Sequence, residues 1–390
     1  MYSVISLHKQ VELMNEKELF KIRQQLPLEA KVEMTKNRIR EWYDFRDGSV
    51  YAARSGGKDS DVLGHILASM GGKYSRIPQV FSNTGLEMPE IVKHVREYLI
   101  GELGHPIKEI KPDVSYRDVW QKEGIPLVSK KVARQIRTLK AGPTGNGDTY
   151  RLYDEGVTSK GHAAPRWKLA NKWRHLVDNP EIKTTEKCCD YLKKDPIKKY
   201  ERMMKDRLGE DLKGGAITGM MADEGGYRAG MTKCNVMDGK TTRSSPMLFW
   251  TEADIWEYIE KYNVQICEVY YARMYNDEGD MVACDSKFVD LPSIKEFTKS
   301  KPLLNMTKWD NLGSFALYED WDDNNRKYGM TGGEKRTGCM FCAFGAHLEK
   351  GSNRFQRMSI SHPRQHKLIM DRIGMREPLE LIDVKVTFDD

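Results

Sequence analysis

The first residues that could carry chemistry lie in one short stretch, Ser55-Gly56-Gly57-Lys58-Asp59-Ser60. Two adjacent glycines let the backbone approach an anion closely, and the amide groups of a helical turn that follows would point at it. Lys58 adds a positive charge at the same place. The Walker sequence G-x-x-x-x-G-K-[ST] is absent, so we predict a phosphate-binding loop of another kind. A glycine turn capped by Asp59 or Ser60 is the alternative interpretation.

The segments around this loop predict the elements that position it. Residues 49–53 form a β-branched and aromatic run, and apolar residues at helical spacing continue from Val62 to Met70, before Gly71. Further strands are predicted at 77–82 and 107–110, with a helix starting at Pro89 between them. Strands that alternate with helices indicate a doubly wound, mostly parallel α/β sheet, whose ligands bind beyond the carboxyl ends of the strands.

Two other loops follow predicted strands and are candidates for the same binding site. The first contains Asn83, Thr84 and Gly85, directly after the second strand. The second follows a buried-looking strand at 214–219. In it, glycines flank acidic residues and an arginine, which would donate hydrogen bonds to an anion. Its candidate ligand-binding residues are Gly219, Glu224 and Arg228.

Two pairs of cysteines could hold a metal. Cys188 and Cys189 are adjacent, and Cys339 and Cys342 form a C-x-x-C pair, so the four thiolates suit zinc or an iron–sulfur cluster. Directly adjacent cysteines favour a [4Fe–4S] cluster over a zinc knuckle, and simple burial of the thiols is the alternative. The remaining cysteines, predicted to be core or surface thiols, are Cys234, Cys267 and Cys284.

Composition narrows the class of protein. The chain has 390 residues, 39% of them hydrophobic and 31% charged, with a formal net charge of +6. No apolar run reaches the roughly 20 residues that span a bilayer, so we expect a cytoplasmic protein without a membrane partner. Seven cysteines in a reducing compartment indicate metal ligation or thiol chemistry more than disulfides.

Basic residues crowd the segment that begins near residue 130. One group lies between Lys130 and Lys140, and a second, between Arg166 and Arg174, is interleaved with Trp167 and Trp173. Cations with aromatic side chains could hold a nucleic acid strand by phosphate contacts and base stacking. A solvated helix that buries its tryptophans in the core explains the pattern equally well.

Several segments, in the same order along the chain, resemble those of the PAPS (phosphoadenosine phosphosulfate) reductase family, and most closely its iron–sulfur branch, the APS (adenosine phosphosulfate) reductases. The family belongs to the N-type ATP pyrophosphatase superfamily. The resemblance implies an adenine nucleotide alpha hydrolase-like fold, a loop site for ATP, APS or PAPS, and a [4Fe–4S] cluster on the four paired cysteines. The segments are 55–60, 81–85, 188–189, 219–229, 246–258 and 338–342.

The chain also departs from that family. Sulfonucleotide reductases carry a lone catalytic cysteine near the C-terminus, and no cysteine follows Cys342 here. Arg54 stands where relatives usually have a small or aromatic residue. We predict a helical N-terminal segment at 1–45, a nucleotide-binding domain at 46–265, an insertion without a recognised counterpart at 266–335, and a helical, cysteine-bearing C-terminal segment at 336–390.

Three functions remain, and the first is an ATP pyrophosphatase of sulfur transfer, similar to the enzymes of nucleic acid thiolation and phosphorothioation. Lys58 and the loop amides would stabilise the phosphates, Ser60 would hold them or Mg²⁺, and Asp59 would cap the helix or orient a magnesium water. Sulfur, from a donor such as a cysteine desulfurase, would be carried by the cluster or by a Cys234 persulfide.

The second function is reduction of APS or PAPS with thioredoxin, with Arg228 holding phosphate or sulfate. The third is a nucleotide-binding regulator without catalytic activity. The sequence does not predict the oligomeric state, and it does not distinguish a nucleic acid acceptor from a small molecule.

Overall fold

The structure, a computed structural model, describes residues 15–145, 147–238, 242–275, 281–285, 329–331, 334, 336–349 and 353–387. The chain divides into two compact units whose segments interleave along the sequence. Unit 1 comprises Met1–Asn83, Pro89–Ile110 and Ile197–Cys267, and unit 2 comprises Thr84–Met88, Lys111–Pro196 and Glu268–Asp390. The predicted domain boundaries stay a prediction, and most of the predicted insertion at 266–335 lies outside the described residues.

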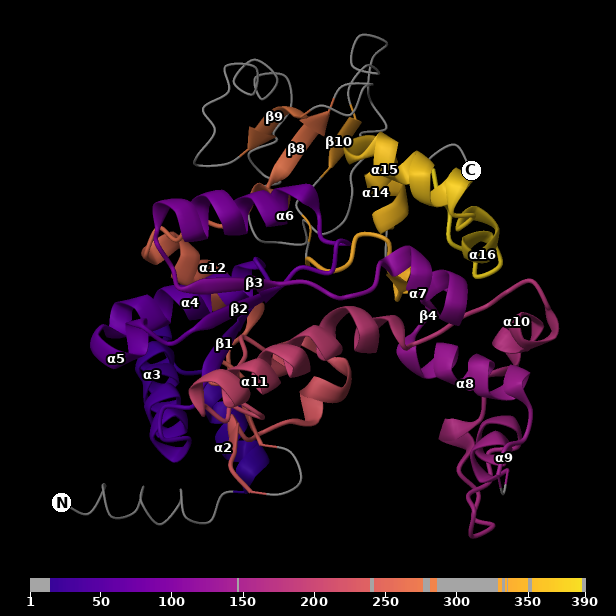
Figure 1. Cartoon of the computed structure of the whole chain (residues 1–390), viewed down its shortest axis with the longest axis horizontal. Helices are drawn as coiled ribbons and strands as arrows, with labels where there is room; N and C mark the ends of the chain where they lie inside the picture. Colours follow the sequence, from indigo (N-terminus) through magenta and orange to yellow (C-terminus); the bar gives the residue numbers. More distant parts are fainter. Residues whose placement is uncertain are drawn as a thin grey trace. The chain divides into compact units, whose positions relative to one another are not determined.

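Unit 1 is built on a six-stranded sheet with the order β3-β2-β1-β5-β7-β6, of which β1, β2 and β3 are labelled in Figure 1. All neighbouring strands are parallel except β6, which pairs antiparallel with β7. This confirms the predicted α/β class with a mostly parallel sheet. The strands are β1 (Tyr51–Arg54), β2 (Gln79–Ser82), β3 (Ile107–Ile110), β5 (Ala216–Ile217), β6 (Asn235–Val236) and β7 (Arg243–Ser244).

The helices of unit 1 begin and end where local sequence predicts. Helix α4 (Lys58–Met70) ends at Gly71, which has a φ of 65°, and α12 (Glu252–Lys261) starts with a capping box between Thr251 and Asp254. The others are α2 (Glu16–Gln24), α3 (Leu28–Phe45), α5 (Gly72–Ser75), α6 (Pro89–Lys93), α11 (Asp195–Leu208), the 3₁₀ helices η5 (Ala222–Glu224) and η6 (Gly226–Gly230), and the π-helix η1 (His94–Glu102).

A buried ion pair ties α3 to α12 behind the sheet. The Lys31 Nζ atom lies 2.7 Å from both carboxylate oxygens of Asp254, and both side chains are almost fully buried. Trp42 of α3 is also buried, and its indole N–H donates to the carbonyl of Gly215. These contacts join α3 to α12 and to the residue before β5 within unit 1.

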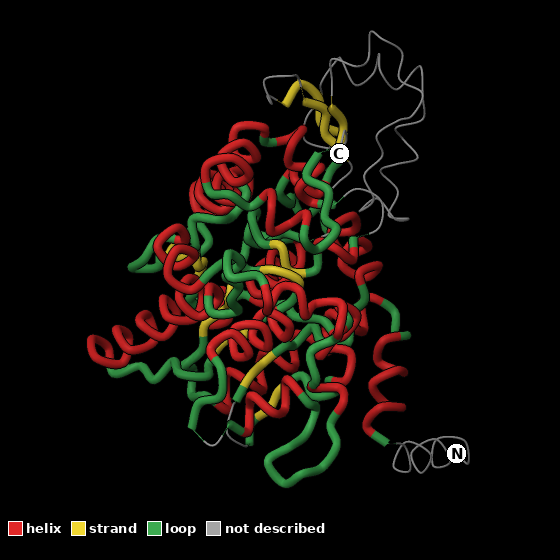
Figure 2. Tube along the Cα trace, turned by 90° about the vertical axis from the view of Figure 1, so that its right-hand side faces the viewer, coloured by secondary structure: helices red, strands yellow, loops and turns green. Residues whose placement is uncertain are grey.

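Helices predominate over short strands in the described part of the chain (Figure 2), and unit 2 is likewise mostly helical. A two-stranded parallel pair joins β4 (Leu127–Val128) to β11 (Ala343–Phe344). A separate three-stranded sheet has the order β10-β8-β9, with β8 (Ala272–Tyr275), β9 (Met281–Asp285) and β10 (Gly329–Thr331).

The helices of unit 2 lie before, between and after strands β4 and β11 in sequence. They are α7 (Tyr116–Glu123), α8 (Lys130–Ala141), α9 (Asp148–Asp154), α10 (Arg174–Asp178), α14 (Arg354–Ser361), α15 (Pro363–Lys367) and α16 (Arg376–Glu380). Shorter 3₁₀ turns are η2 (Pro165–Trp167), η3 (Asn171–Trp173), η7 (Glu268–Tyr270) and η10 (Ala346–Leu348), and π-helices are η4 (Asp190–Lys194) and η11 (Leu368–Arg372).

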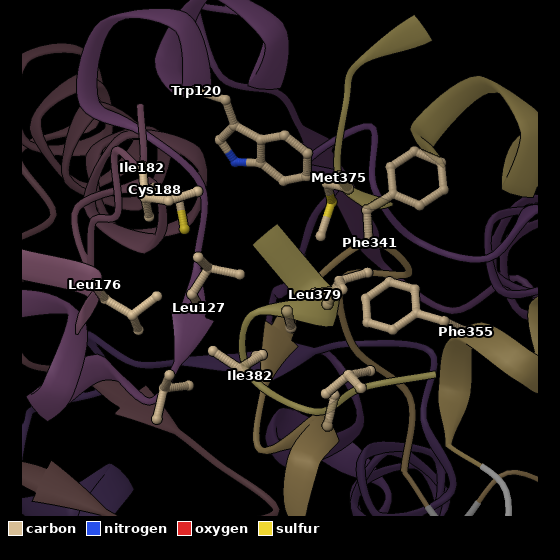
Figure 3. Close-up of a cluster of buried hydrophobic side chains, with 14 of the residues drawn as sticks. Trp120, Leu127, Leu176, Ile182, Cys188, Phe341, Phe355, Met375, Leu379 and Ile382 are labelled. Carbon is tan, nitrogen blue, oxygen red and sulfur yellow. The ribbon is translucent and has the colours of Figure 1, made fainter. Parts of the chain in front are cut away.

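The core of unit 2 collects apolar side chains from segments far apart in sequence (Figure 3). Trp120 and Leu127 pack with Phe341 and Leu379, and Cys188 belongs to the same buried cluster. The core therefore places one of the predicted metal ligands among buried apolar side chains. Of the described helices, none is both long enough and apolar enough to cross a membrane.

Candidate functional site

The glycine loop of unit 1 follows β1 at the point where the strand order of the sheet reverses. From β1 the chain moves to β2 and β3 on one side, and β5 and β7 lie on the other side. In open parallel sheets, the crevice at such a switch point is where ligands bind. The predicted position of Ser55–Ser60 at the carboxyl end of a parallel strand is therefore confirmed.

Two glycines are required by close packing around this loop. Gly56 has a φ of 70°, and a Cβ atom there would lie 2.8 Å from methyl groups of both Ile91 and Val95. A Cβ atom on Gly219, in the loop after β5, would lie 2.9 Å from the carbonyl oxygen of Asp59. The loop after β5 therefore packs against the first turn of α4. This places Gly219 beside the glycine loop, with which the sequence analysis grouped it.

Helix α4 begins at Lys58, directly after the two glycines of the loop. Its N-cap residue, Gly57, makes no side-chain capping hydrogen bond. The first N–H groups of a helix have no partner within the helix, and the helix dipole adds positive potential there. The Ser60 hydroxyl is occupied inside the loop, because it donates to the Gly57 carbonyl at 2.8 Å and accepts from the Ser55 amide at 3.2 Å. Ser60 therefore closes the loop.

Lys58 is buried at the first position of α4, between acidic and aromatic side chains. Its Nζ atom lies 3.4 Å from Asp59 Oδ1 and 3.4 Å from Glu252 Oε1. The same atom lies 5.6 Å from the centre of the Trp256 ring, within cation–π distance. Helix α12 therefore holds the lysine that sequence analysis assigned to phosphate binding.

A buried charged network lies beneath the loop, and sequence reasoning did not predict it. The Arg54 guanidinium lies 3.1 Å from Asp61 Oδ1, and its Nη1 atom donates to the Ser60 carbonyl oxygen. His94 Nε2 lies 2.8 Å from the other carboxylate oxygen of Asp61. Burial lowers the Arg54 pKa, and the Asp61 charge opposes that shift. The unusual arginine before the loop thus braces the first turn of α4.

Gly64 makes room for that arginine. A Cβ atom at Gly64 would lie 1.6 Å from the Arg54 Nη1 atom, which no side chain could tolerate without moving the buried guanidinium. Close packing of Arg54 against Gly64 thus fixes the end of β1 to the body of α4. Its signal in the sequence was a glycine within the apolar pattern of the helix, close to the unexpected arginine.

Other residues predicted for the nucleotide site form ion pairs or hydrogen bonds with neighbouring protein side chains. The partly exposed Arg228 guanidinium forms an ion pair with Glu224, whose carboxylate also accepts from the Met221 amide at 3.0 Å. Asn83 donates to Glu109 at 2.9 Å. An anion that bound Arg228 would compete with Glu224. The binding roles of these residues stay predictions.

In unit 2, a short extended segment brings both cysteine pairs together. The Ile125 amide donates to the Lys183 carbonyl, and the Thr185 amide donates to the Ile125 carbonyl, three residues before Cys188. On the same segment, β4 pairs with β11, which begins directly after Cys342. Hydrogen bonding on both sides of residues 125–128 therefore joins segments about 150 residues apart in the chain.

The thiols influence one another's pKa values. The hydrogen bond within the adjacent pair lowers the pKa of Cys189 to about 5, with help from Lys130 and Lys193, and raises the pKa of Cys188. Burial raises the pKa of Cys339, and it raises that of Cys342 to about 11. The charges of Cys339 and Cys342 also act on Cys188. The four thiols are therefore near enough for their charges to influence one another, and Cys189 is the one of the four whose pKa is lowered.

Side chains around the thiols supply positive charge and hydrogen bonds. Burial alone would lower the Lys193 pKa, but the neighbouring Cys339, Glu87 and Cys189 raise it, so this lysine remains charged. Thr84 Oγ1 lies 3.9 Å from Cys339 Sγ and 2.9 Å from the Glu87 carboxylate. Thr84, which was predicted for the nucleotide site, thus contacts the cysteine site. Gly85 follows it with a φ of 76°.

Val128, the last residue of β4, has a φ of 61°, an unfavourable backbone region for a β-branched residue. The backbone there accepts from the Gly345 amide at 2.8 Å, just beyond the second cysteine pair. Strain is therefore stored beside the site that the four cysteines form.

The four thiols fit a metal centre by donor type, because soft metals and iron–sulfur clusters bind thiolates. Within the part of the chain that the structure describes, no three or more His, Cys, Asp or Glu side chains are spaced so as to hold a metal ion. The described cysteines carry free thiols. The metal-binding role of Cys188, Cys189, Cys339 and Cys342 stays a prediction.

The remaining described cysteines are buried. Burial raises the Cys234 pKa to about 11, which leaves this thiol protonated at neutral pH, and Cys267 is 2% exposed. The side chain of Cys284 lies outside the described residues. Cys234 and Cys267 are buried, as expected for core thiols. Their burial argues against a mobile nucleophile at either position.

The sequence is similar to one protein family and to two sulfate adenylyltransferase subunits. Residues 151–340 match the phosphoadenosine phosphosulfate reductase domain, a range that contains Cys188, Cys189, Arg228 and Cys339 but neither the glycine loop nor Cys342. Two sulfate adenylyltransferase subunit 2 proteins of Marinobacter nauticus are 32% and 29% identical over 85 residues. These 85 residues are 21% of this chain and 26% of each relative, so the chain spans about a quarter of the curated relatives it matches.

A solved structure was also found. The crystal structure of phosphoadenylyl-sulfate (PAPS) reductase from Candida auris, in a phosphate complex, aligns with a TM-score of 0.34 and 14% sequence identity. The alignment covers 60% of this chain and 82% of that chain.

Proposed function

Because residues 151–340 match the phosphoadenosine phosphosulfate reductase domain, we propose that this chain is an adenine-nucleotide enzyme of sulfur chemistry. Its reaction is of the ATP pyrophosphatase type, in which an acceptor oxygen is adenylylated and sulfur then displaces AMP. The observation that carries the proposal is the start of α4: a helix N-terminus directly after the glycine loop, with Lys58 at its first position, at the switch point of a parallel sheet.

In the first step, an acceptor oxygen attacks the α-phosphorus of ATP. A new oxygen–phosphorus bond forms, the bond to the leaving pyrophosphate breaks, and any proton on the acceptor oxygen passes to solvent. The amides of the first turn of α4 and the Lys58 ammonium stabilise the negative charge on the phosphates. Ser60 holds the loop closed around them, and Arg54 braces the turn from beneath.

In the second step, hydrosulfide attacks the activated acceptor, and AMP leaves with the acceptor oxygen. A carbon–oxygen or phosphorus–oxygen bond is thereby exchanged for a bond to sulfur, without net oxidation or reduction. Cys188, Cys189, Cys339 and Cys342 would hold a [4Fe–4S] cluster, which supplies a binding site for inorganic sulfur. Lys130 and Lys193 offset the negative charge of these thiolates. Cys234, a buried and protonated thiol, has no step in this reaction.

The activities for which the similar proteins are named bear on the choice of reaction. A sulfate adenylyltransferase transfers an adenylyl group, which supports adenylylation as the first step here. The second candidate is reduction of APS or PAPS, favoured by the name of the matched domain. That reaction needs a nucleophilic thiol, and among the described cysteines outside the four-cysteine site, Cys234 and Cys267 are buried.

The test measures two products from the same anaerobically purified protein. Pyrophosphate release is followed with ATP, a sulfide source and candidate acceptors, and sulfite release is followed with APS or PAPS and thioredoxin. We expect pyrophosphate release that depends on Lys58, and no sulfite. Sulfite release without pyrophosphate release from ATP would replace the proposed reaction by the reductase reaction.

A further inference from the structure

The segment from residue 130 to residue 187 concentrates the positive charge of the chain. It contains thirteen lysines and arginines against six aspartates and glutamates, an excess larger than the formal charge of +6 of the whole chain. The segment includes α8, α9 and α10 (Figure 1). Electrostatic potential at this part of unit 2 therefore favours a polyanionic partner.

Several acidic residues of the segment are already neutralised within it. Asp154 lies 2.5 Å from Arg174, Glu186 lies 2.7 Å from Arg137, and Glu155 pairs with Arg151 at 3.7 Å. These pairs use only three of the thirteen cations. Exposed side chains outside these ion pairs include Lys131, Arg134, Arg166, Lys168 and Lys172.

Hydrogen bonds hold the turn 165–168 against α8. Lys131 donates to the Arg166 carbonyl oxygen, and Gln135 donates to the Trp167 carbonyl oxygen at 2.5 Å. Lys131 Nζ also lies 5.4 Å from the centre of the Trp167 ring. With its carbonyl groups turned to α8, the turn presents the Arg166, Trp167 and Lys168 side chains as exposed groups.

The two tryptophans of this region have different environments. Trp173 is 7% exposed and belongs to the core of unit 2, as the solvated-helix interpretation predicts. Trp167 is 39% exposed, between two exposed cations in the sequence. An exposed indole beside arginine and lysine can stack on a base while the cations contact the flanking phosphates.

We propose that the basic face formed by Lys131, Arg134, Arg166, Trp167 and Lys168 binds a single-stranded nucleic acid. Charge complementarity favours a polyanion, and the exposed indole favours a strand with unpaired bases over an acidic protein surface. The inference rests on the proposed function in one respect, because the bound strand would be the acceptor of sulfur.

The test uses the full-length, anaerobically purified protein and a fluorescently labelled 20-nucleotide DNA or RNA strand of mixed sequence. Anisotropy titrations give the dissociation constant at several salt concentrations. Each phosphate contact contributes about 0.7 to the slope of log K against log salt for single strands, so Arg166→Gln with Lys168→Gln should lower the slope by about 1.4. Trp167→Ala should weaken binding about tenfold, and Trp167→Phe should restore most of it.

A matched control removes the same charge elsewhere. Lys205→Gln with Arg207→Gln changes two exposed cations on α11, in unit 1, and should leave the slope and the dissociation constant unchanged. The proposal is overturned if no strand binds. It is also overturned if duplex DNA binds as tightly as single strands and Trp167→Ala leaves the dissociation constant unchanged. Equal competition by a polyglutamate peptide would likewise overturn it. ATP titrated into the same wild-type sample separates a failure of this face from a failure of the nucleotide site.

Discussion

The glycine loop of unit 1 and the four-cysteine site of unit 2 are built in different ways. Six consecutive residues form the loop, and the strand before it and the helix after it place its amides. The cysteine site joins two pairs about 150 residues apart, through hydrogen bonds on both sides of residues 125–128. Local sequence therefore determines the first site, whereas the second depends on tertiary pairing, and damage to one should leave the other measurable.

The largest expected effect is at the cysteine site. Cys339→Ser removes one ligand of the proposed cluster, so the anaerobically purified variant should lose most of its iron, its sulfide and its absorbance at about 400 nm. The matched control, Cys234→Ser, changes a buried thiol of unit 1 and should keep them. Full iron and sulfide content in Cys339→Ser would sink the cluster assignment.

The next largest effect is expected where Arg54 packs against Gly64 beneath the glycine loop. Gly64→Ala forces a methyl group onto the Arg54 guanidinium and should lower the free energy of unfolding by about 3 kcal/mol. Arg54→Ala leaves the buried Asp61 without its ion pair and is also costly. In urea unfolding, the double variant should cost at least about 1 kcal/mol less than the sum of the single variants. Simple additivity would show that the two positions do not compete for space.

A smaller effect is expected on nucleotide affinity. Lys58→Ala removes a buried cation beside the amides of α4 and should weaken ATP binding about 10- to 100-fold, as measured by calorimetry, with the iron content unchanged. Lys73→Ala, which removes an exposed lysine paired with Asp44 in the same unit, is the control and should bind ATP normally. Loss of iron in Lys58→Ala would contradict the independence of the two sites.

The smallest effect is a pH dependence of unit 1. Burial, with a contribution from Arg54, lowers the His105 pKa from 6.5 to about 4. Between pH 6.5 and about 4, His105 is protonated in the unfolded chain but mostly neutral in the folded chain. The free energy of unfolding therefore falls as the pH falls from 6.5 toward 4. Since the ring is only partly buried, we expect a loss of about 1 kcal/mol at pH 5.

His105→Gln should remove that part of the dependence, measured as the difference in urea midpoint between pH 7 and pH 5. The exposed His162→Gln variant is the control and should follow the wild type. A His105→Gln protein that loses as much stability as the wild type between these pH values would show that other groups carry the dependence.

The same contrast explains what could be predicted from the sequence. The strand at 107–110, the glycine end of α4 and the capping box before α12 follow from local patterns, and the structure reproduces them. Adjacency and the C-x-x-C spacing pointed to the cysteines, but their convergence depends on β4, a strand of two residues. No periodicity identifies so short a strand.

Other contacts were missed for equally physical reasons. The link between Arg54 and Asp61 depends on a side chain that reaches beneath a helix, which spacing does not reveal. Lys193 was identifiable in principle, since it follows Cys189 by one helical turn. Thr84 was assigned to the nucleotide because it follows a strand, whereas its hydroxyl contacts Glu87 and Cys339.

The central claim, that the glycine loop is a site for ATP, is tested most directly by titrating the wild-type protein with labelled ATP, APS and PAPS and repeating each titration with Lys58→Ala. The account predicts saturable, one-to-one binding of ATP that weakens about 10- to 100-fold in the variant. Failure of ATP to bind, or unchanged ATP affinity in Lys58→Ala, would contradict it.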